Sequence, residues 1–236
     1  MKENNVNLLC TRLLPGSLLN KAYEHGIMID VLPFIYSAPI ATKEVIADIQ
    51  NLQSKKITAV FTSVNAVEAV LPHLSAKPDW DVYCMGGITK EAVISFLGAN
   101  AIKGTARNAV NLAEKIIANN VKGEIIFFCS DHRLEKLPGI LSSNGFDIKE
   151  MIVYNTIQTP HVIEKEYDGI IFFSPSAVHS FFSENTISTE VILFAIGKTT
   201  ASTIATYVMN EIVSSEWPGQ EQLIDQVIQY YSNVKH

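Results

Sequence analysis

The chain has 236 residues, of which 47% are hydrophobic, and it carries a formal net charge of −6 with a pI near 5.5. These values predict a globular protein of one large or two small domains and exclude a disordered chain. The acidic balance and the lack of any basic run argue against nucleic acid as the main partner. The N-terminal stretch MKENNVNLLC has no apolar core of signal-peptide length, and no later stretch is long enough to span a bilayer, so we expect a cytoplasmic protein.

Apolar runs alternate along the chain with stretches of helical period. In chain order they are NLLCT (7–11), IMIDVL (27–32), ITAVFT (57–62), DVYCMG (81–86), EIIFFCS (124–130), KEMIVY (149–154), GIIFFS (169–174) and VILFAIG (191–197). If each run is a strand that precedes a helix, the order predicts parallel sheets with helices on both faces. The expected fold class is therefore α/β.

Polar residues after several of these runs mark the expected helix starts. In TSVNAVEAVL (62–71) and SPSAVHSFF (174–182), a hydroxyl directly after the strand can accept from the first free N–H groups of a helix. Gly26 and Gly145 stand where a helix should end before the next strand.

Segments about half the chain apart resemble each other. A separation of 111 residues joins VFTSVNAV (60–67) to IFFSPSAV (171–178) and Gly86 to Gly197, and a separation of 119 joins LLCT (8–11) to FFCS (127–130). Such pairs predict an internal duplication into two doubly wound, flavodoxin-like units of five strands each. The binding surface of each unit is expected at the carboxyl ends of its strands.

The segment FAIGKTTASTI (194–204) contains a Gly-Lys-Thr sequence but is not a P-loop, because Ile192 occupies the position of the required earlier glycine. It belongs instead to a set of four short turns that follow strands and open helices. Helix starts present unpaired N–H groups, so turns that face one cleft predict an anion site, while each turn alone is also compatible with an ordinary helix cap. The residues of these turns that we single out are Thr62, Ser63, Asn65, Gly86, Ser174, Ser176, Gly197, Lys198, Thr199 and Thr200.

Other catalytic and metal patterns are missing from the sequence. The three cysteines, Cys10, Cys84 and Cys129, have no CxxC spacing, and we expect buried reduced thiols rather than a catalytic or metal role. The histidines show no metal-ligand spacing, and there is no Ser-His-Asp order, HExxH or GxGxxG. No metal site and no cofactor are expected.

Several segments, in their order and spacing, resemble uroporphyrinogen-III synthases over about residues 8–228. They are FTSVNAVEA, YCMGGIT, KGTARNAVNLAEKI, FFCSDHRLEKLP, VYNT, FFSPSAV and AIGKTTA. The resemblance implies two α/β lobes joined by a two-stranded hinge at about residues 33–40 and 153–160. Residues 1–36 and 157–236 would form one lobe, and residues 37–156 the inserted one.

The resemblance also implies a reaction: closure of the anionic linear tetrapyrrole hydroxymethylbilane to uroporphyrinogen III, with inversion of the last ring and loss of water. It implies that Tyr154 is a candidate acid, although a strand aromatic with its hydroxyl in solvent is an equal alternative. Ser174, Ser176, Thr199 and Thr200 match family positions that contact the tetrapyrrole side chains, and Thr62 and Ser63 are their counterparts on the other lobe.

Some positions depart from the family pattern. Cys129 and Ser130 stand where many relatives have an arginine-glycine pair, which puts an anion contact there in doubt. Arg107 and Arg133 remain either carboxylate partners or solvated surface residues, and Lys198 is either a cation beside the substrate or merely exposed.

Two other functions remain as alternatives. One is a non-catalytic two-lobed module that binds an anion or has a regulatory role, and the other is a nucleotide enzyme, disfavoured by the missing glycines. A clamp that opens and closes can act as a monomer, which is the expected state.

Overall fold

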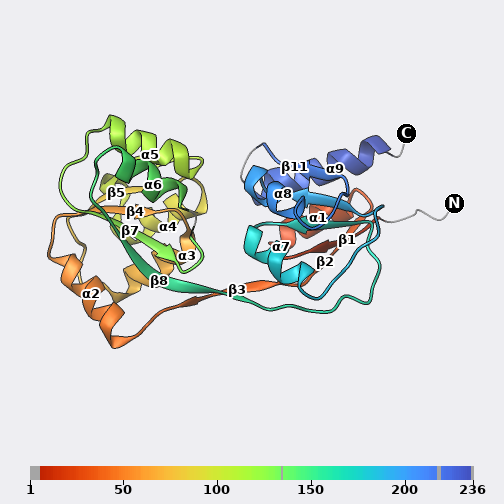
Figure 1. Ribbon diagram of the computed structural model, residues 1–236, viewed down its shortest axis with the longest axis horizontal. Coiled ribbons are helices and arrows are strands. Elements are labelled where there is room, and N and C mark those ends of the chain that lie inside the picture. The colour runs from red at the N-terminus through yellow and green to blue at the C-terminus, as the bar shows by residue number, and fades with distance from the viewer. Residues whose placement is uncertain (1–5, 134, 217–218, 235–236) are drawn as a thin grey trace. The chain divides into compact units, whose positions relative to one another are not determined.

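The computed structural model describes residues 6–133, 135–216 and 219–234. The chain divides into two compact units, which we call unit 1, Met1–Tyr36 with Ile157–His236, and unit 2, Ser37–Thr156. Figure 1 labels their elements. Unit 1 is therefore discontinuous in sequence, and unit 2 is inserted into it.

Unit 1 is a five-stranded sheet with helices on both faces. Its strands are β1 (Val6–Cys10), β2 (Ile27–Val31), β9 (Gly169–Phe172), β10 (Ile192–Ala195) and β11 (Ile212–Ser214). They lie in the order β11-β10-β9-β1-β2, and every pair is parallel. Its helices are α1 (Gly16–Tyr23), α7 (Pro175–Phe182), α8 (Lys198–Ile204) and α9 (Gln220–Val234).

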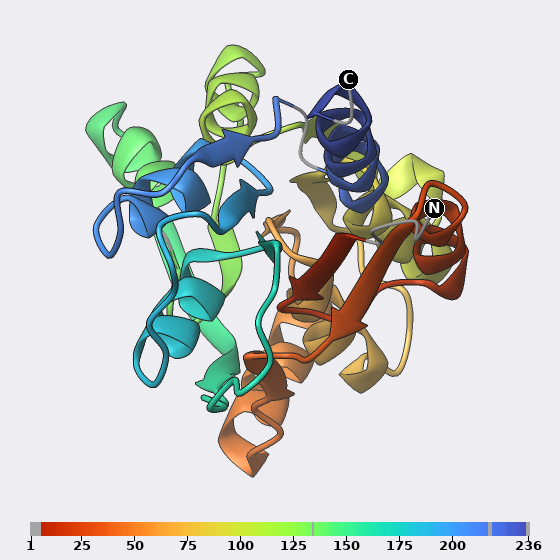
Figure 2. The same ribbon diagram turned by 90° about the vertical axis from the view of Figure 1, so that its right-hand side faces the viewer.

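Side chains on alternate positions of these strands enter two separate cores. Leu8 and Cys10 of β1 pack with α1 and α9, whereas Leu9 between them packs with α7 and α8. Figure 2 shows α1 and α9 on one side of this sheet and α7 and α8 on the other. This period of two on a strand buried on both faces explains why β1 reads as an uninterrupted apolar run.

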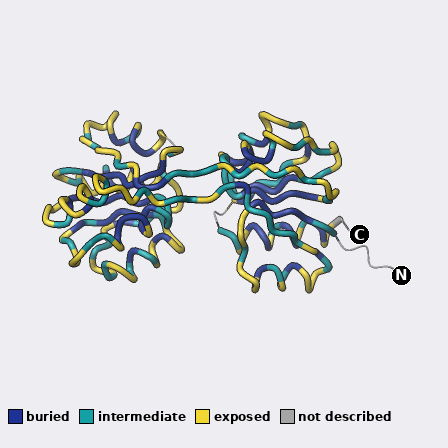
Figure 3. The backbone as a smooth tube through the Cα atoms, turned by 90° about the horizontal axis from the view of Figure 1, so that it is seen from below, coloured by how far each residue is buried: buried dark blue, intermediate teal, exposed yellow. Residues whose placement is uncertain are grey.

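Unit 2 repeats this architecture. Its sheet contains β4 (Thr58–Phe61), β5 (Asp81–Met85), β6 (Ile102–Ala106) and β7 (Ile125–Ser130), together with the two connecting strands described below. Its helices are α2 (Lys43–Gln53), α3 (Val64–Val70), α4 (Ile88–Leu97), α5 (Ala109–Ala118) and α6 (Lys136–Ser143). Short 3₁₀ helices cover Leu71–His73 and Ala99–Ala101. Helices α2, α3 and α4 pack on one face of the sheet, and α5 and α6 on the other. In Figure 3 the buried segments run through the middle of each unit and the exposed ones cover its outside.

Two strands carry the chain from one unit to the other, and they are neighbours. The unit boundary falls within β3 (Ile35–Pro39) and within β8 (Ile148–Gln158), which lie side by side at the edge of the second sheet, ordered β3-β8-β7-β4-β5-β6. Phe34, directly before β3, is fully buried in unit 1 and makes an edge contact with Phe181, with ring centroids 5.2 Å apart. On the unit 2 side, the Ile40 N–H donates to the Val153 carbonyl at 2.9 Å.

The two sheets have one strand order, which confirms the predicted duplication. Starting from β2 and from β8, the orders read β2-β1-β9-β10-β11 and β8-β7-β4-β5-β6. The chain enters this common order at β1 in one unit and at β4 in the other. The two sequence registers follow from this difference, since 111 residues relate β4 and β5 to β9 and β10, while 119 relate β1 to β7.

One part of the expected alternation is wrong. The runs IMIDVL (27–32) and KEMIVY (149–154) do not precede helices, because β2 leads to β3 and the long strand β8 leads to β9. Pro33, between β2 and β3, lacks the N–H and the conformational freedom that a helix interior needs. By contrast, Gly26 and Gly145 end helical segments with φ angles of 72° and 82°, as expected.

Candidate functional site

The predicted site residues gather at the carboxyl edge of each sheet. In unit 1 the turns after β9 and β10 are adjacent because these strands pair, and in unit 2 the turns after β4 and β5 are adjacent for the same reason. Each sheet also has a switch point, a pair of neighbouring strands whose following helices cover opposite faces. The switch points are β1/β9 and β7/β4, and ligands of open α/β sheets bind at such positions.

A serine caps the helix at each switch point. The Ser63 hydroxyl, at the start of α3, accepts from the Asn65 N–H at 3.1 Å, and the Ser174 hydroxyl, at the start of α7, accepts from the Ala177 N–H at 3.2 Å. Pro175 carries no N–H, so Ser176 supplies the free N–H of the first turn of α7. The predicted cap role of both serines is confirmed. Each cap occupies one N–H group that could otherwise donate to a bound anion.

Thr62 and Asn65 are half-buried beside the Ser63 cap. The Asn65 side-chain amide donates to the Ser37 hydroxyl at 2.7 Å, which joins the start of α3 to strand β3. Asn65 is therefore already engaged within unit 2.

The glycine turns after β5 and β10 have no side-chain cap. Gly87, with φ 66°, precedes α4, and Gly197, with extended backbone, precedes α8. The first intrahelical bonds are those from Glu91 to Gly87 and from Ala201 to Gly197, so three N–H groups at each helix start remain for a ligand or water. In α8 these belong to Lys198, Thr199 and Thr200.

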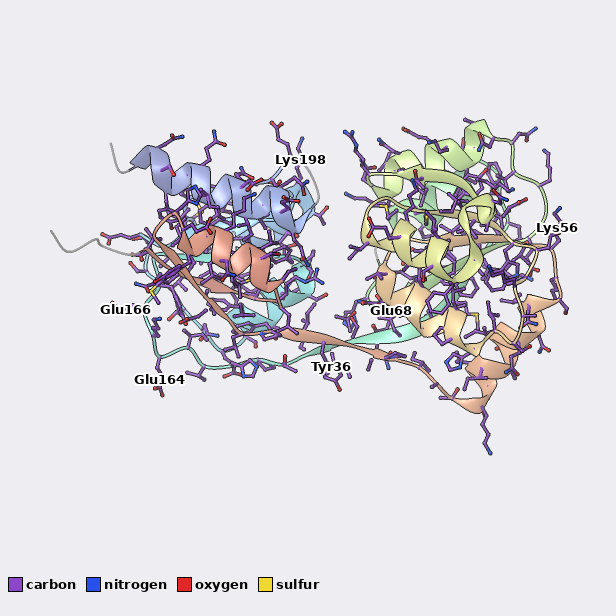
Figure 4. All side chains as sticks on the ribbon, turned by 180° about the vertical axis from the view of Figure 1, so that it is seen from behind. Tyr36, Lys56, Glu68, Glu164, Glu166 and Lys198 are labelled. Atoms are coloured by element: carbon purple, nitrogen blue, oxygen red, sulfur yellow. The ribbon has the colours of Figure 1, made fainter. Side chains whose placement is uncertain are left out.

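Two of the predicted residues in these turns are less available than expected. The Gly86 N–H donates to the Ala106 carbonyl at 2.9 Å, because Gly86 continues the pairing of β5 with β6. Thr200 is only 3% exposed, and α8 has no side-chain cap bond, so the turn after β10 is not an ordinary cap formed by the Thr200 hydroxyl. Lys198 is exposed at the start of α8 (Figure 4), as is Thr199.

Tyr154 lies on β8, with its side chain 8% exposed. Its ring belongs to the core under α2, α3 and α4 rather than to a solvated strand edge. Its carbonyl accepts from the Asp131 N–H at 3.3 Å, so it is next to the switch point of unit 2. Within the described residues its hydroxyl has no hydrogen-bond partner.

The loop after β7 carries a charged group that the sequence did not single out. The Asp131 carboxylate accepts from the Thr156 N–H at 2.9 Å and contacts the His132 ring, with Oδ1 and Nδ1 3.0 Å apart. Burial opposes ionisation of Asp131, but these hydrogen bonds outweigh it and leave the pKa of the carboxyl below its usual value. This switch point therefore presents a carboxylate.

The two arginines left open by the sequence have different surroundings. Arg133 pairs with Glu150 and with Glu135, so its charge is compensated inside unit 2. Arg107 is exposed after β6. A further arginine, Arg12, lies two residues after the end of β1, and its guanidinium carbon is 5.5 Å from the centre of the Phe173 ring. No pattern in the sequence signals this contact, since it joins residues that are far apart in the chain.

The three cysteines are buried and unpaired, as expected. Burial raises the pKa of Cys10 to about 12 and that of Cys84 and Cys129 to about 11, so these thiols remain protonated near neutral pH. In the part of the chain that the structure describes, no three His, Cys, Asp or Glu side chains are grouped to hold a metal ion. No helix of the described residues is long and apolar enough to cross a membrane.

A cavity of about 880 Å³ lies in unit 1, away from these turns. It is lined by Asn7 and Ile192, at the amino ends of β1 and β10, and by acidic residues that include Glu164 and Glu166, labelled in Figure 4. None of the predicted site residues lines it.

The comparisons with known proteins agree on one family. The family model described as uroporphyrinogen-III synthase HemD matches residues 17–225. Among solved structures, uroporphyrinogen-III synthetase from Helicobacter pylori is similar with a TM-score of 0.66 at 15% identity, covering 95% of this chain and 99% of that one. A mutant uroporphyrinogen III synthase from the extremely thermophilic bacterium Thermus thermophilus gives 0.67 at 14% identity, covering 98% and 99%. At these identities the structural likeness shows a shared fold.

Proposed function

Because this chain belongs to the uroporphyrinogen-III synthase family, enzymes of tetrapyrrole biosynthesis, we propose that it cyclises hydroxymethylbilane with inversion of the last ring. The match over residues 17–225, most of both units, carries this proposal. The paired turns at the carboxyl edges of the two sheets support it, because duplicated helix starts suit a substrate with many carboxylates.

The reaction needs an ordered substrate more than a strong protein acid. A pyrrole nitrogen donates its electron pair as the terminal C–O bond breaks, and the hydroxyl takes a proton and leaves as water. The substituted carbon of the last ring then attacks the terminal methylene carbon, which has lost its hydroxyl, and a spiro intermediate forms. This intermediate opens and closes again with the last ring inverted. The products are water and the cyclic tetrapyrrole, and no oxidant, reductant or organic cofactor is required for the balance.

Closure without an enzyme gives the uninverted isomer, so the protein must favour attack through the substituted carbon. Holding reacting groups in place can contribute about 7–11 kcal/mol in favourable intramolecular cases. Free N–H groups at the starts of α4 and α8 would bind acetate and propionate groups through charge-assisted hydrogen bonds. Such bonds fix orientation without adding many cations to an acidic protein.

Tyr154 is the residue to which we assign a role at the reacting end. Its burial fixes the ring, and its hydroxyl has no partner among the described residues. The hydroxyl can then donate to the departing oxygen or to the folded intermediate.

The test is to add purified protein to freshly generated hydroxymethylbilane, oxidise the products and separate the porphyrin isomers by chromatography. We expect a protein-dependent change from isomer I to isomer III without added metal or nucleotide. Isomer I alone, at the rate seen without protein, would refute the proposal and favour a non-catalytic anion-binding module. A thermal shift with ATP or NAD would instead favour a nucleotide enzyme.

We also propose that the protein works as a monomer in the cytoplasm. One chain contributes both duplicated sets of turns, so a second copy is not needed to complete them. Sedimentation of the active protein at its working concentration tests this, and turnover confined to a dimer would contradict it.

A further inference from the structure

Hydrogen bonds fix the main chain on both sides of Arg12, at the switch point of unit 1. The N–H and the hydroxyl of Thr11 both donate to the Ile171 carbonyl, at 3.0 and 2.9 Å, and the Phe34 N–H donates to the Thr11 carbonyl at 3.2 Å. The Cys10 thiol donates to the Arg12 carbonyl at 3.1 Å. The main chain around Arg12 is therefore fixed to β9 and to the segment before β3.

The side chain of Arg12 extends across this switch point. The loop from β1 leads to α1 on one face of the sheet, and the turn from β9 leads to α7 on the other. Because the guanidinium lies over the ring of Phe173, which directly precedes the Ser174 cap, it spans the two loops. An arginine stacked on an aromatic ring keeps its donors directed outward in the ring plane.

Among the described residues, this cation has no acidic partner. Within residues 6–133, 135–216 and 219–234, no carboxylate lies within ion-pair distance of Arg12. Burial of part of the side chain lowers its pKa, whereas a neighbouring carboxylate would raise it. Arg12 is exposed, so its uncompensated charge is accessible to a bound anion.

The switch point of unit 2 has the opposite character. There the loop after β7 presents the Asp131 carboxylate, and the nearby Arg133 is paired with Glu150 and Glu135. An anion would be repelled by Asp131 but attracted by Arg12. The duplicated fold thus has one switch point suited to a carboxylate and one suited to a hydrogen-bond donor or a neutral group.

We propose that Arg12 binds a carboxylate of the tetrapyrrole at the β1/β9 switch point and so determines which end of the substrate unit 1 holds. This rests on the proposed function. Arg12 is a binding and positioning residue that touches a side-chain carboxylate, and the reacting carbon lies elsewhere. Contact with the Phe173 ring restricts the guanidinium, whose planar fork of donors suits a bidentate contact with a carboxylate.

The test compares Arg12→Gln and Arg12→Lys with Lys165→Gln in the full chain. Lys165 is a matched control, because it is a cation of unit 1 that lines the cavity at the opposite edge and pairs with Asp30 at 2.7 Å. For isomer III formation, we expect Arg12→Gln to raise KM about ten- to hundredfold, the range for hydrogen bonds to charged groups. The KM of Arg12→Lys should lie between those of wild type and Arg12→Gln, since lysine keeps the charge but lacks the paired donors of a guanidinium. The KM of Lys165→Gln should match wild type.

A second measurement separates recognition of charge from a role in packing. Binding of the isomer III porphyrin, which is the oxidised form of the product, and of its neutral amide, in which every carboxylate is amidated, is measured by fluorescence titration. Arg12→Gln should weaken binding of the acid and leave the amide unchanged. If Arg12→Gln loses affinity equally for both ligands, or keeps the wild-type KM while wild type makes isomer III, the role assigned to Arg12 is overturned and the proposed function stands. Failure of wild type to make isomer III would overturn the proposed function as well.

Discussion

Replacing Tyr154 by phenylalanine removes a hydroxyl without disturbing the core that surrounds the ring. The side chain is 8% exposed and packs under α2, α3 and α4. Truncation to alanine would leave a cavity there and cost about 3–5 kcal/mol, as for other large aromatic residues, so a loss of activity in Tyr154→Ala would say nothing about chemistry. Tyr154→Phe keeps the ring volume.

The size of the expected effect follows from the partners of the hydroxyl. Since it makes no hydrogen bond to the described residues, its removal should change the free energy of unfolding by no more than about 0.5 kcal/mol. If it donates to charge that develops as the C–O bond breaks, the lost interaction is about 1.5–3 kcal/mol. At about 1.4 kcal/mol per factor of ten, kcat should fall about 10- to 150-fold.

The assay measures kcat for isomer III and the denaturant midpoint on the same preparations. Tyr83→Phe is the control, because Tyr83 is buried on the other face of the same sheet and its hydroxyl accepts from the Asn119 amide at 2.8 Å. That variant should lose about 1 kcal/mol of stability and keep its kcat. Wild-type turnover in Tyr154→Phe would refute the acid role.

Three further predictions concern the caps, the thiols and the glycines. Ser174→Ala should cost about 1 kcal/mol of stability, because it removes the acceptor for the Ala177 N–H, and Ser174→Gly only a few tenths; equal losses in denaturant unfolding would contradict this. Burial raises the pKa of Cys10 to about 12, so the folded thiol keeps its proton where the unfolded one ionises, and stability should fall as pH rises from about 9 towards that value; a flat denaturant midpoint over this range would be contrary. Gly139→Ala, inside α6 with open space around the new Cβ, should stabilise by about 0.5–1 kcal/mol, whereas Gly145→Ala, at φ 82°, should destabilise by about 1–2 kcal/mol; the same sign for both in thermal unfolding would disprove the backbone argument.

The features that depend on nearby residues could be predicted from the sequence. The apolar runs of the central strands, the caps at Ser63 and Ser174 and the glycine at position 145 each have a local physical cause, and all were found. The duplication was also predictable, because matched turn residues recur at fixed separations. Its two registers reflect the different strand at which the chain enters each sheet.

The features that were missed depend on residues far apart in the chain. The Gly86 N–H is used by Ala106, a partner on the next strand, and no local pattern signals that bond. The stacking of Arg12 on Phe173 requires β1 to lie beside β9, which follows only from the fold. The helix expected after IMIDVL is the exception, because Pro33 directly after this run is a local signal against a helix. Site chemistry is less visible than architecture because it depends on contacts between distant residues.

The interrupted path of the chain through unit 1 has a consequence for its synthesis on the ribosome. Strand β1 emerges early, but its neighbour β9 begins only at Gly169, after all of unit 2 has been made. At about 5–20 residues per second, the interval is roughly ten to thirty seconds. During that time β1 and β2 form at most a two-stranded ribbon, which is marginal in water. Leu8 and Leu9, which are buried in the folded protein, therefore stay exposed while unit 2 is made, and such exposed apolar surface makes the nascent segment prone to aggregation.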